Sequence, residues 1–222
     1  MNNTNTYKAV LLLGPTGTGK TPLGQQLETR NLWGKTYRHF DFGEKLREAA
    51  ALSDGAAGKE GESGVKLTKK ELETIKNVLK SNTLLEDGDF NIAEKLLSAF
   101  IGESVSPSGP ETEIIILNGL PRHTGQAEAL GRIIDVRLVI MLEAHPAVIK
   151  ERIKSNSGGD RTGREDDSED EINRKLDIYR QQTVPLLEYY KKLDRTILEI
   201  EVETDTIPLY IIQGLETMPD LL

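Results

Sequence analysis

Five segments of strand length recur along the chain, and segments with helical patterning separate them. Three of the five, residues 7–13, 113–117 and 136–142, are dominated by leucine, isoleucine and valine, which is typical of strands covered on both faces. Residues 36–42 and 196–202 are strand candidates with more polar positions. Because strands alternate with helices, the pattern predicts an α/β fold: a five-stranded parallel sheet with helices on both faces.

The clearest helical pattern covers residues 67–81, where apolar side chains recur at positions 72, 75, 78 and 79. Thr68 is suited to cap the amino end of this helix. A longer helix is expected over residues 169–193, bent near Pro185. The other expected helices are residues 22–30, 43–52, 91–101, 126–134, 146–154 and 207–217. Polar and glycine-rich loops are expected at residues 53–64 and 156–168.

The segment Gly14–Thr21 (GPTGTGKT) has the pattern of a phosphate-binding P-loop, G-x-x-x-x-G-K-[ST]. It follows the first predicted strand and precedes a helix, so several backbone N–H groups and a helix amino end converge on one point, which favours an anion. The glycines let the backbone pass close to phosphates. Lys20 would reach the β- and γ-phosphates of a nucleotide, and the Thr21 hydroxyl would face Mg²⁺.

Composition limits the class of protein. The 222 residues suit one domain, and 37% hydrophobic with 29% charged residues is ordinary for a globular chain. The net charge of -8 argues against a nucleic-acid-coating surface. No apolar run is long enough for a membrane span, the amino end has no signal-peptide pattern, and there is no cysteine. We therefore expect a cytoplasmic monomer without nucleic-acid or membrane partners.

Several polar segments follow the carboxyl ends of predicted strands. They are the P-loop, residues 39–43, residues 118–122 and the segment after Leu142. In open parallel sheets, ligands bind at the carboxyl ends of the strands. We therefore expect these segments to line one crevice.

Four motifs, in order, resemble those of the adenylate kinase branch of the nucleoside monophosphate kinases. They are the P-loop, Phe42–Arg47 (FGEKLR), Asn118–Arg122 (NGLPR) followed by Gln126, and a stretch from Gly163 (GREDD) through Leu176 and Tyr179 to Pro185. The resemblance implies a single P-loop kinase domain over residues 1–222. It also implies two inserts, a monophosphate-binding region at residues 43–85 and a short lid at residues 155–168.

The resemblance further implies transfer of the ATP γ-phosphoryl group to AMP (ATP + AMP = 2 ADP), with Mg²⁺ bound to ATP. The catalytic residues it implies are Lys20, Arg122, Arg164 and Lys175. The implied ATP-binding residues are Gly17, Thr18, Gly19, Lys20, Thr21 and Arg152. The implied acceptor-binding residues are Gly43, Arg47, Leu67, Gly119, Arg122 and Gln126. Thr21 and, through water, Asn118 would serve the metal.

The chain departs from the family pattern in three side chains and one length. Asn118 replaces the aspartate that orders Mg²⁺-bound water, although Asp41 at the end of the second strand can compensate. Phe42 replaces a threonine or serine near the acceptor base. Lys175 replaces an arginine, exchanging a planar fork for a point charge. The stretch 87–109 is longer than the family usually carries there.

Two alternatives to an AMP kinase stay open. One is a kinase for UMP, CMP or another small acceptor. The other is a catalytically weak nucleotide-binding relative with a regulatory role, which the three departures favour. Retention of both arginine clamps, Arg47 and Arg122, argues against the second alternative, because a protein that only binds nucleotide would not need both.

Overall fold

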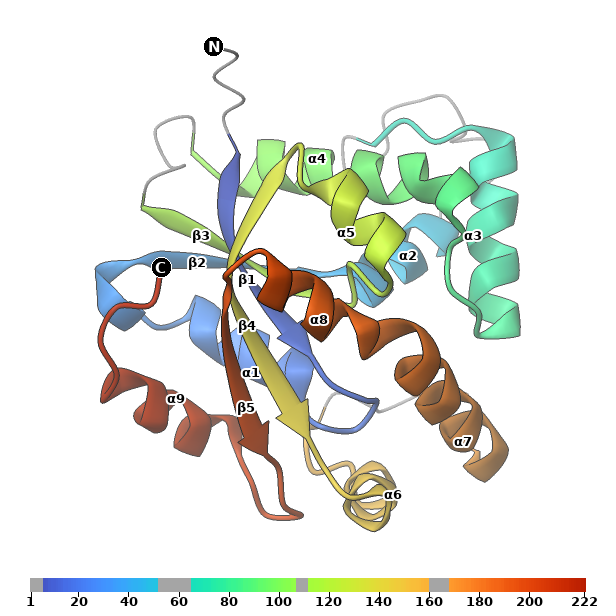
Figure 1. The fold of residues 1–222 in the computed structure, drawn as a ribbon. Coiled ribbons are helices and arrows are strands. Elements are labelled where there is room, and N and C mark those ends of the chain that lie inside the picture. Colours follow the sequence, from blue (N-terminus) through green and yellow to red (C-terminus); the bar gives the residue numbers. More distant parts are fainter. Residues whose placement is uncertain (1–5, 52–64, 107–111, 160–167) are drawn as a thin grey trace.

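A single five-stranded sheet organises the chain (Figure 1). The computed structural model describes residues 6–51, 65–106, 112–159 and 168–222. Every strand pairing is parallel, and the strand order is β2-β3-β1-β4-β5. The bounds of the strands are β1 Tyr7–Leu13, β2 Thr36–Asp41, β3 Glu113–Asn118, β4 Ile134–Glu143 and β5 Thr196–Glu201. The predicted fold class is confirmed.

Helices connect the strands and cover both faces of the sheet. Their bounds are α1 Lys20–Glu28, α2 Phe42–Ala51, α3 Lys69–Ser81, α4 Phe90–Ser104, α5 Thr124–Leu130, α6 Pro146–Ser155, α7 Glu169–Ile178, α8 Pro185–Lys192 and α9 Pro208–Glu216. Short 3₁₀ turns lie at Leu32–Gly34 and Asp87–Asp89. The predicted cap of α3 is present: the Thr68 hydroxyl accepts from the Glu71 N–H, and the Glu71 carboxylate accepts from the Thr68 N–H.

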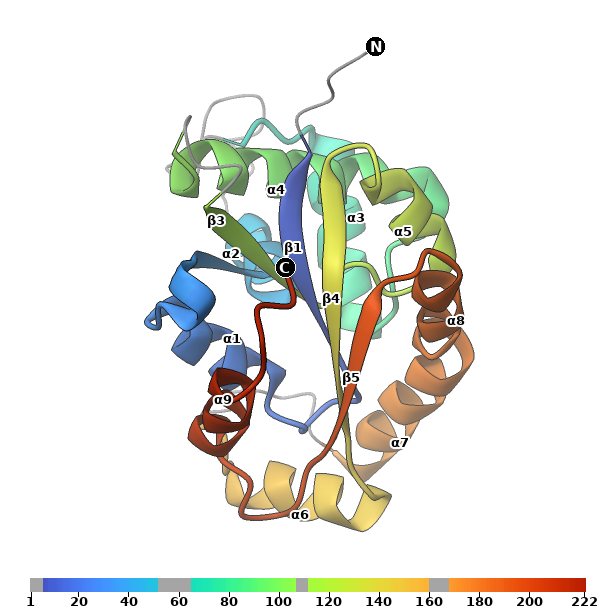
Figure 2. The same ribbon diagram turned by 60° about the vertical axis from the view of Figure 1, so that its left-hand side comes forward.

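The two cores follow from the alternation of side chains along buried strands. In β1, Ala9, Leu11 and Leu13 face α2–α5 and α8, whereas Val10 and Leu12 face α1 and α9. Figure 2 shows these two helical layers on either side of the sheet. A strand with apolar residues on both faces fits only between two such layers, which explains its continuous apolar sequence.

Two expected helices differ from the structure. The helix expected over residues 126–134 ends at Leu130, and Ile134 already begins β4. Apolar residues that bridge a helix end and a strand start give no periodicity that separates the two. The helix expected over residues 169–193 is divided into α7 and α8 by a π-helical turn, Tyr179–Thr183, directly before Pro185. The ring of Pro185 removes one N–H and displaces the preceding turn, so the expected bend is present.

Parts of the expected inserts lie outside the described residues: 52–64 in the acceptor region and 160–167 in the lid. The assignment of these two inserts as separate units stays a prediction. In the long stretch 87–109, α4 packs Ile92, Leu96 and Phe100 into the core below β2 and β3. Most of this stretch is therefore a structural layer of the domain.

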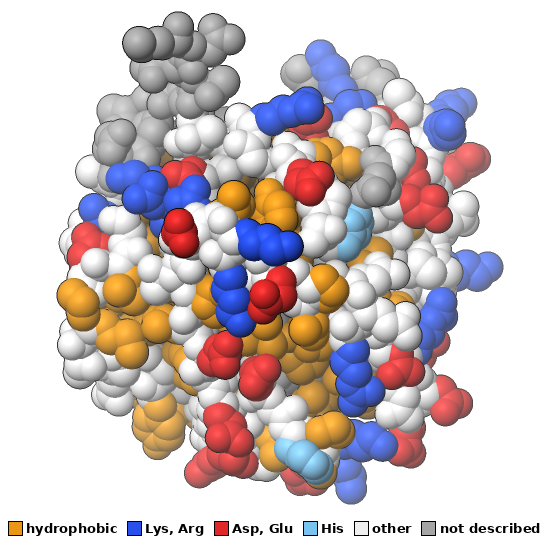
Figure 3. All heavy atoms as spheres, viewed as in Figure 1, with side chains coloured by type: hydrophobic (Ala, Val, Ile, Leu, Met, Phe, Trp, Pro, Cys, Tyr) orange, Lys and Arg blue, Asp and Glu red, His pale blue; other side chains and the backbone are white. Residues whose placement is uncertain are grey.

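The surface gives no sign of a polyanion-binding face on the side seen in Figure 3, where acidic and basic side chains are interspersed. Within the described ranges, no helix is both long enough and apolar enough to cross a membrane.

Candidate active site

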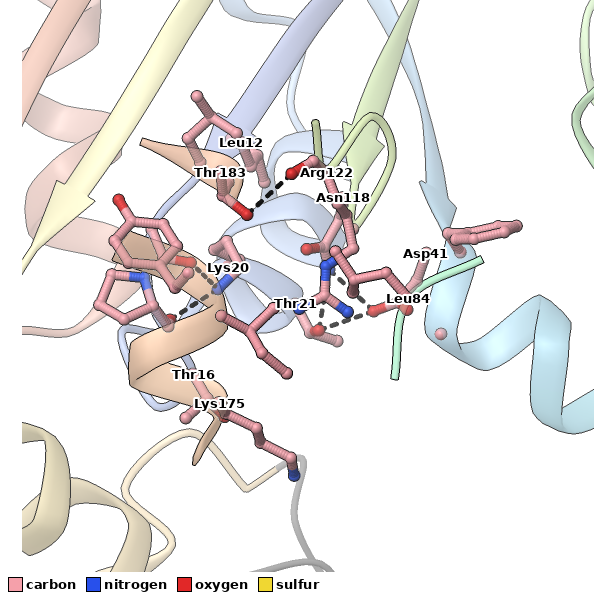
Figure 4. A pocket seen from close by; sticks show the side chains of 18 of the residues that line it. Leu12, Thr16, Lys20, Thr21, Asp41, Leu84, Asn118, Arg122, Lys175 and Thr183 are labelled. Atoms are coloured by element: carbon pink, nitrogen blue, oxygen red, sulfur yellow. Dashed lines mark hydrogen bonds between the residues drawn. The ribbon is translucent and has the colours of Figure 1, made fainter. Parts of the chain in front are cut away.

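A pocket of about 250 Å³ opens at the carboxyl ends of the central strands. The segments that follow β1, β2 and β3 all contribute to it, as the strand order requires. Its other walls come from the end of α3, the segment Asn82–Leu85, and the α7–π-turn stretch that includes Lys175, Tyr179 and Thr183. Three of the four segments expected to line one crevice do so: the P-loop, residues 39–43 and residues 118–122 (Figure 4). The segment directly after Leu142 does not line it, and Arg152 of α6 contributes instead.

The P-loop wraps the end of β1 with glycines in conformations that other residues rarely adopt. Gly14, Gly17 and Gly19 have φ angles of 145°, 82° and 91°. A Cβ on Gly17 would lie 2.8 Å from Cγ1 of Ile153 on α6, so the loop also depends on close packing. The Thr18 hydroxyl donates to the Pro15 carbonyl at 2.9 Å and is buried, so it braces the loop from inside.

Lys20 begins α1 and its side chain folds back over the loop. Its Nζ donates to the carbonyls of Gly14 and Pro15, both at 2.7 Å. The ammonium group is therefore held at the mouth of the loop, where a phosphate would be cradled by backbone N–H groups.

Thr21, Asp41 and Asn118 form a closed triangle of hydrogen bonds (Figure 4). The Thr21 hydroxyl donates to Asp41 Oδ2 at 2.7 Å, and Asn118 Nδ2 donates to the same oxygen at 2.8 Å and to Thr21 Oγ1 at 2.9 Å. Asp41 and Asn118 are register partners at the ends of β2 and β3. Asp41 was expected only to compensate for the aspartate missing at position 118. In the structure it contacts Thr21 directly.

Arg122 supplies a cation on the opposite side of the pocket from Lys20. Its backbone is anchored at both ends, because its carbonyl accepts from the Thr183 hydroxyl at 3.0 Å and its N–H donates to Gln126 Oε1 at 2.9 Å. Among the described residues, none accepts a hydrogen bond from its guanidinium. Desolvation by the surrounding protein lowers the pKa of Arg122 to about 10, so the charged group is held where an anion would stabilise it.

Arg47 lies at the exposed rim of the same pocket, one helical turn along α2 from Gly43. A Cβ on Gly43 would stand 3.3 Å from Arg47 Nη1 and 3.3 Å from Asp41 Oδ1. The missing side chain at Gly43 therefore gives the guanidinium room beside the first turn of α2.

Gln126 is almost fully buried beneath the pocket, and the protein itself occupies its amide. Besides the bond from Arg122 N–H, its Nε2 donates to the Leu85 carbonyl at 3.2 Å. A base read by this amide would have to share or replace the Leu85 carbonyl. The base-reading role of Gln126 stays a prediction.

Arg152 of α6 lies against the P-loop at the other end of the pocket. Its Nε donates to the Gly17 carbonyl at 3.1 Å, and its Nη1 donates to the carbonyls of Glu203, Thr204 and Thr206 at 2.7, 3.2 and 2.9 Å. These bonds hold the planar guanidinium between the P-loop and the segment after β5, as a surface on which a base could stack. Arg152 thus has a structural role whatever its role toward ATP.

The structure does not bring every expected residue to this pocket. Leu67 is a core residue that lines a separate small cavity with Val65, Leu96 and Phe100, so the expectation that it lines the acceptor site is corrected. Arg164 lies outside the described residues. Lys175, Gly119 and the P-loop residues other than the buried Thr18 do line the pocket.

Val78, Leu79 and the segment Asn82–Leu85 also line the pocket. They lie in the expected acceptor region 43–85, but none of them was expected as a site residue. Asn82 ends α3 in the left-handed conformation, and the chain turns there toward the pocket. That helix-end signal was the one feature that could have pointed to this wall.

The donor set near the P-loop suits Mg²⁺ bound to a nucleotide. Thr21 and Asp41 present a hydroxyl and a carboxylate at the pocket, and Mg²⁺ prefers such oxygen ligands while keeping several of its waters. Among the described residues, no group of three His, Asp or Glu side chains could hold a metal by itself. The Thr21 hydroxyl and the Asp41 carboxylate suit a metal that takes its remaining ligands from water and nucleotide phosphates.

Several known proteins similar to this chain are all adenylate kinases. The chain is 31% identical over 189 residues to the adenylate kinase of Synechococcus sp. (strain WH7803), covering 82% of this chain and 84% of that protein. It is 32% identical over 190 residues to the adenylate kinase of another Synechococcus strain, CC9311, with the same coverage. The adenylate kinase of Porphyromonas gingivalis is 29% identical over 207 residues, 89% of each chain. No protein-family model matches the chain.

Proposed function

The chain belongs to the adenylate kinase family, and we propose that AMP is the acceptor of the phosphoryl group that it transfers from ATP. Family membership makes it an ATP-dependent phosphotransferase acting on nucleoside monophosphates. One observation supports the placement of the two substrates: a single pocket holds a P-loop with Lys20 on one side and the partly buried guanidinium of Arg122 on the other.

In this proposal ATP lies with its phosphates on the P-loop and its base toward Arg152, and the acceptor phosphate lies between Arg47 and Arg122. Phosphoryl transfer requires positioning and charge neutralisation more than covalent chemistry. The planar fork of Arg122 can bind two oxygens of one phosphate and aim it at the donor. Mg²⁺, when bound with ATP, would neutralise part of the phosphate charge.

Lys20 is proposed to leave the Gly14 and Pro15 carbonyls and bind the transferring phosphoryl group. In a site that excludes water, its charge stabilises the transition state more strongly than it would in water. Lys175, which lines the same pocket from α7, and Arg164 of the expected lid are proposed to share the negative charge from the lid side. Closing the lid would exclude water and limit wasteful hydrolysis of ATP.

A kinase for UMP or CMP is the second candidate, and a specific observation favours it. The amide of Gln126 is already bonded within the protein, and Phe42, with its ring packed against Phe40, replaces a polar side chain near the acceptor. Both features reduce the polar groups that could distinguish an adenine.

The choice of acceptor is tested by the specificity constant for AMP, UMP, CMP and GMP with ATP as donor. We expect AMP to exceed the pyrimidine nucleotides by about tenfold or more, because a purine fills more of the pocket and can share the Gln126 amide. The variant Gln126→Glu keeps the acceptor for Arg122 N–H but loses the donor, so it should reduce this ratio. A higher specificity constant for UMP or CMP would exclude AMP as the preferred acceptor while leaving the kinase assignment intact.

A further inference from the structure

The carboxylate beside the P-loop threonine comes from β2 and not from β3. The family resemblance places it at the end of the third strand of the chain, where this protein has Asn118. The structure has the carboxylate on the neighbouring strand, as Asp41 of β2, in contact with both Thr21 and Asn118. The amide and the carboxylate therefore occupy paired positions at the ends of two neighbouring strands.

We propose that Asp41 supplies the carboxylate that orders the water on nucleotide-bound Mg²⁺, and that Asn118 is a positioning residue that holds Asp41 in place. The inference rests on the proposed function, since the metal arrives with ATP. It assigns this chain's metal-ordering carboxylate to β2 and predicts that the amide and the carboxylate can be exchanged.

The hydrogen bonds around Asp41 leave room for this role. Its Oδ1 accepts from the Glu44 N–H at 3.0 Å, and its Oδ2 accepts from Thr21 and Asn118. A carboxylate has about four acceptor positions, so three bonds leave one for a metal-bound water. Asp41 is only 7% exposed, and that small exposed part borders the pocket.

The same bonds prepare the Thr21 oxygen. The Thr21 hydroxyl donates a hydrogen bond to Asp41, and one of its two lone pairs accepts a hydrogen bond from Asn118 Nδ2. The second lone pair remains for a cation. With an acceptor carboxylate and an acceptor hydroxyl as neighbours, Asn118 can only present its NH₂ group to them, which sets the orientation of its amide.

A purely structural explanation exists for Asp41, because its bond to the Glu44 N–H caps the first turn of α2. Asparagine caps helices about as well as aspartate does. Asp41→Asn keeps the cap through its amide oxygen, but it removes the charge and places an NH₂ group where Oδ2 accepts from Thr21 and Asn118. The exchange variant Asp41→Asn/Asn118→Asp restores a carboxylate acceptor opposite that NH₂ group, so the two variants together are informative.

The test measures the affinity of Mn²⁺, as a spectroscopic substitute for Mg²⁺, for the complex of the protein with a non-hydrolysable ATP analogue, by electron paramagnetic resonance. Asp41→Asn should weaken Mn²⁺ binding by about tenfold or more, as loss of an outer-shell partner does. The exchange variant Asp41→Asn/Asn118→Asp should recover most of that loss. Asn118→Asp alone should change Mn²⁺ affinity little or increase it.

Glu113→Gln is the matched control, since Glu113 is a similarly buried carboxylate at the other end of β3, bonded to Arg38 and to the Ser106 N–H. It should leave Mn²⁺ affinity unchanged. An unchanged affinity in Asp41→Asn, or a loss that the exchange variant does not recover, would overturn the proposal. Should Asp41→Asn fail to fold, the exchange variant decides: near-wild-type affinity supports the proposal, and a loss of about tenfold overturns it.

The proposal and the proposed function can fail separately. Wild-type turnover with the panel of monophosphates tests the function, whereas Mn²⁺ affinity is measured without any acceptor. If the wild type is an active kinase and Asp41→Asn leaves its Mn²⁺ affinity unchanged, this inference is rejected and the proposed function stands. A protein that binds Mn²⁺–nucleotide through Asp41 but phosphorylates no monophosphate would reject the function alone.

Discussion

Lys20→Met is expected to lower the turnover number by at least about two orders of magnitude. The substitution keeps the length and most of the volume of the side chain and removes the charge that would bind the transferring phosphoryl group. The loss should fall on the turnover number more than on the Michaelis constants, because Lys20 is proposed to act most strongly on the charge of the transition state. Steady-state kinetics of ADP formation with ATP and AMP measure both.

The control for this experiment is Lys35→Met, which removes a lysine that pairs with Asp220 at 3.8 Å and does not line the pocket. Its kinetics should equal those of the wild type. Because Lys20 also bonds to the Gly14 and Pro15 carbonyls, the thermal midpoint of both variants should be compared. Near-normal turnover in a folded Lys20→Met protein would contradict the assignment of the P-loop to ATP.

Arg122→Met is expected to weaken AMP binding by about 10- to 100-fold while ATP binding changes little, since hydrogen bonds to charged groups contribute about 1.5–3 kcal/mol each. Arg122 lies on the acceptor side of the pocket, and the phosphates of ATP rest on the P-loop. Calorimetric titrations of each nucleotide separately measure the two affinities. Equal losses for ATP and AMP would contradict the two-site arrangement.

The same variant makes a prediction about stability with a defined sign. Desolvation lowers the pKa of Arg122 to about 10, so the charged form is less favourable in the folded protein than in the unfolded chain. This cost is present in full below pH 10 and decreases as the pH rises through 10. At neutral pH without ligand, Arg122→Met should therefore melt at the same temperature as the wild type or higher.

Added AMP should raise the melting temperature of the wild type, because a ligand that binds only the folded state stabilises it. It should raise that of Arg122→Met much less. Arg137→Met serves as the control, since Arg137 is an exposed side chain bonded to Asp135 at the amino end of β4. A large loss of stability in Arg122→Met without ligand would show that the guanidinium serves the fold rather than an anion.

Local rules account for much of the fold. Apolar runs on β1, β3 and β4 predicted buried parallel strands, because a strand between two helical layers must be apolar on both faces. The Thr68 cap and the bend before Pro185 followed from single side chains that act on their own backbone. The limits of α5 did not follow, because apolar residues continue from its end into β4.

The sequence by itself determined the P-loop, since the geometry of that loop is set by contiguous glycines and by the helix that follows them. Only the tertiary structure decided which side chains meet across the pocket. Leu67 was expected in the acceptor site, but it packs in the core just before α3, and Leu84 and Leu85 after α3 line the pocket instead. The contact of Asp41 with Thr21 and Asn118 depends on the register of β2 against β3, which joins residues 77 positions apart. Such contacts are set by the packing of whole strands, and no local pattern of side chains records them.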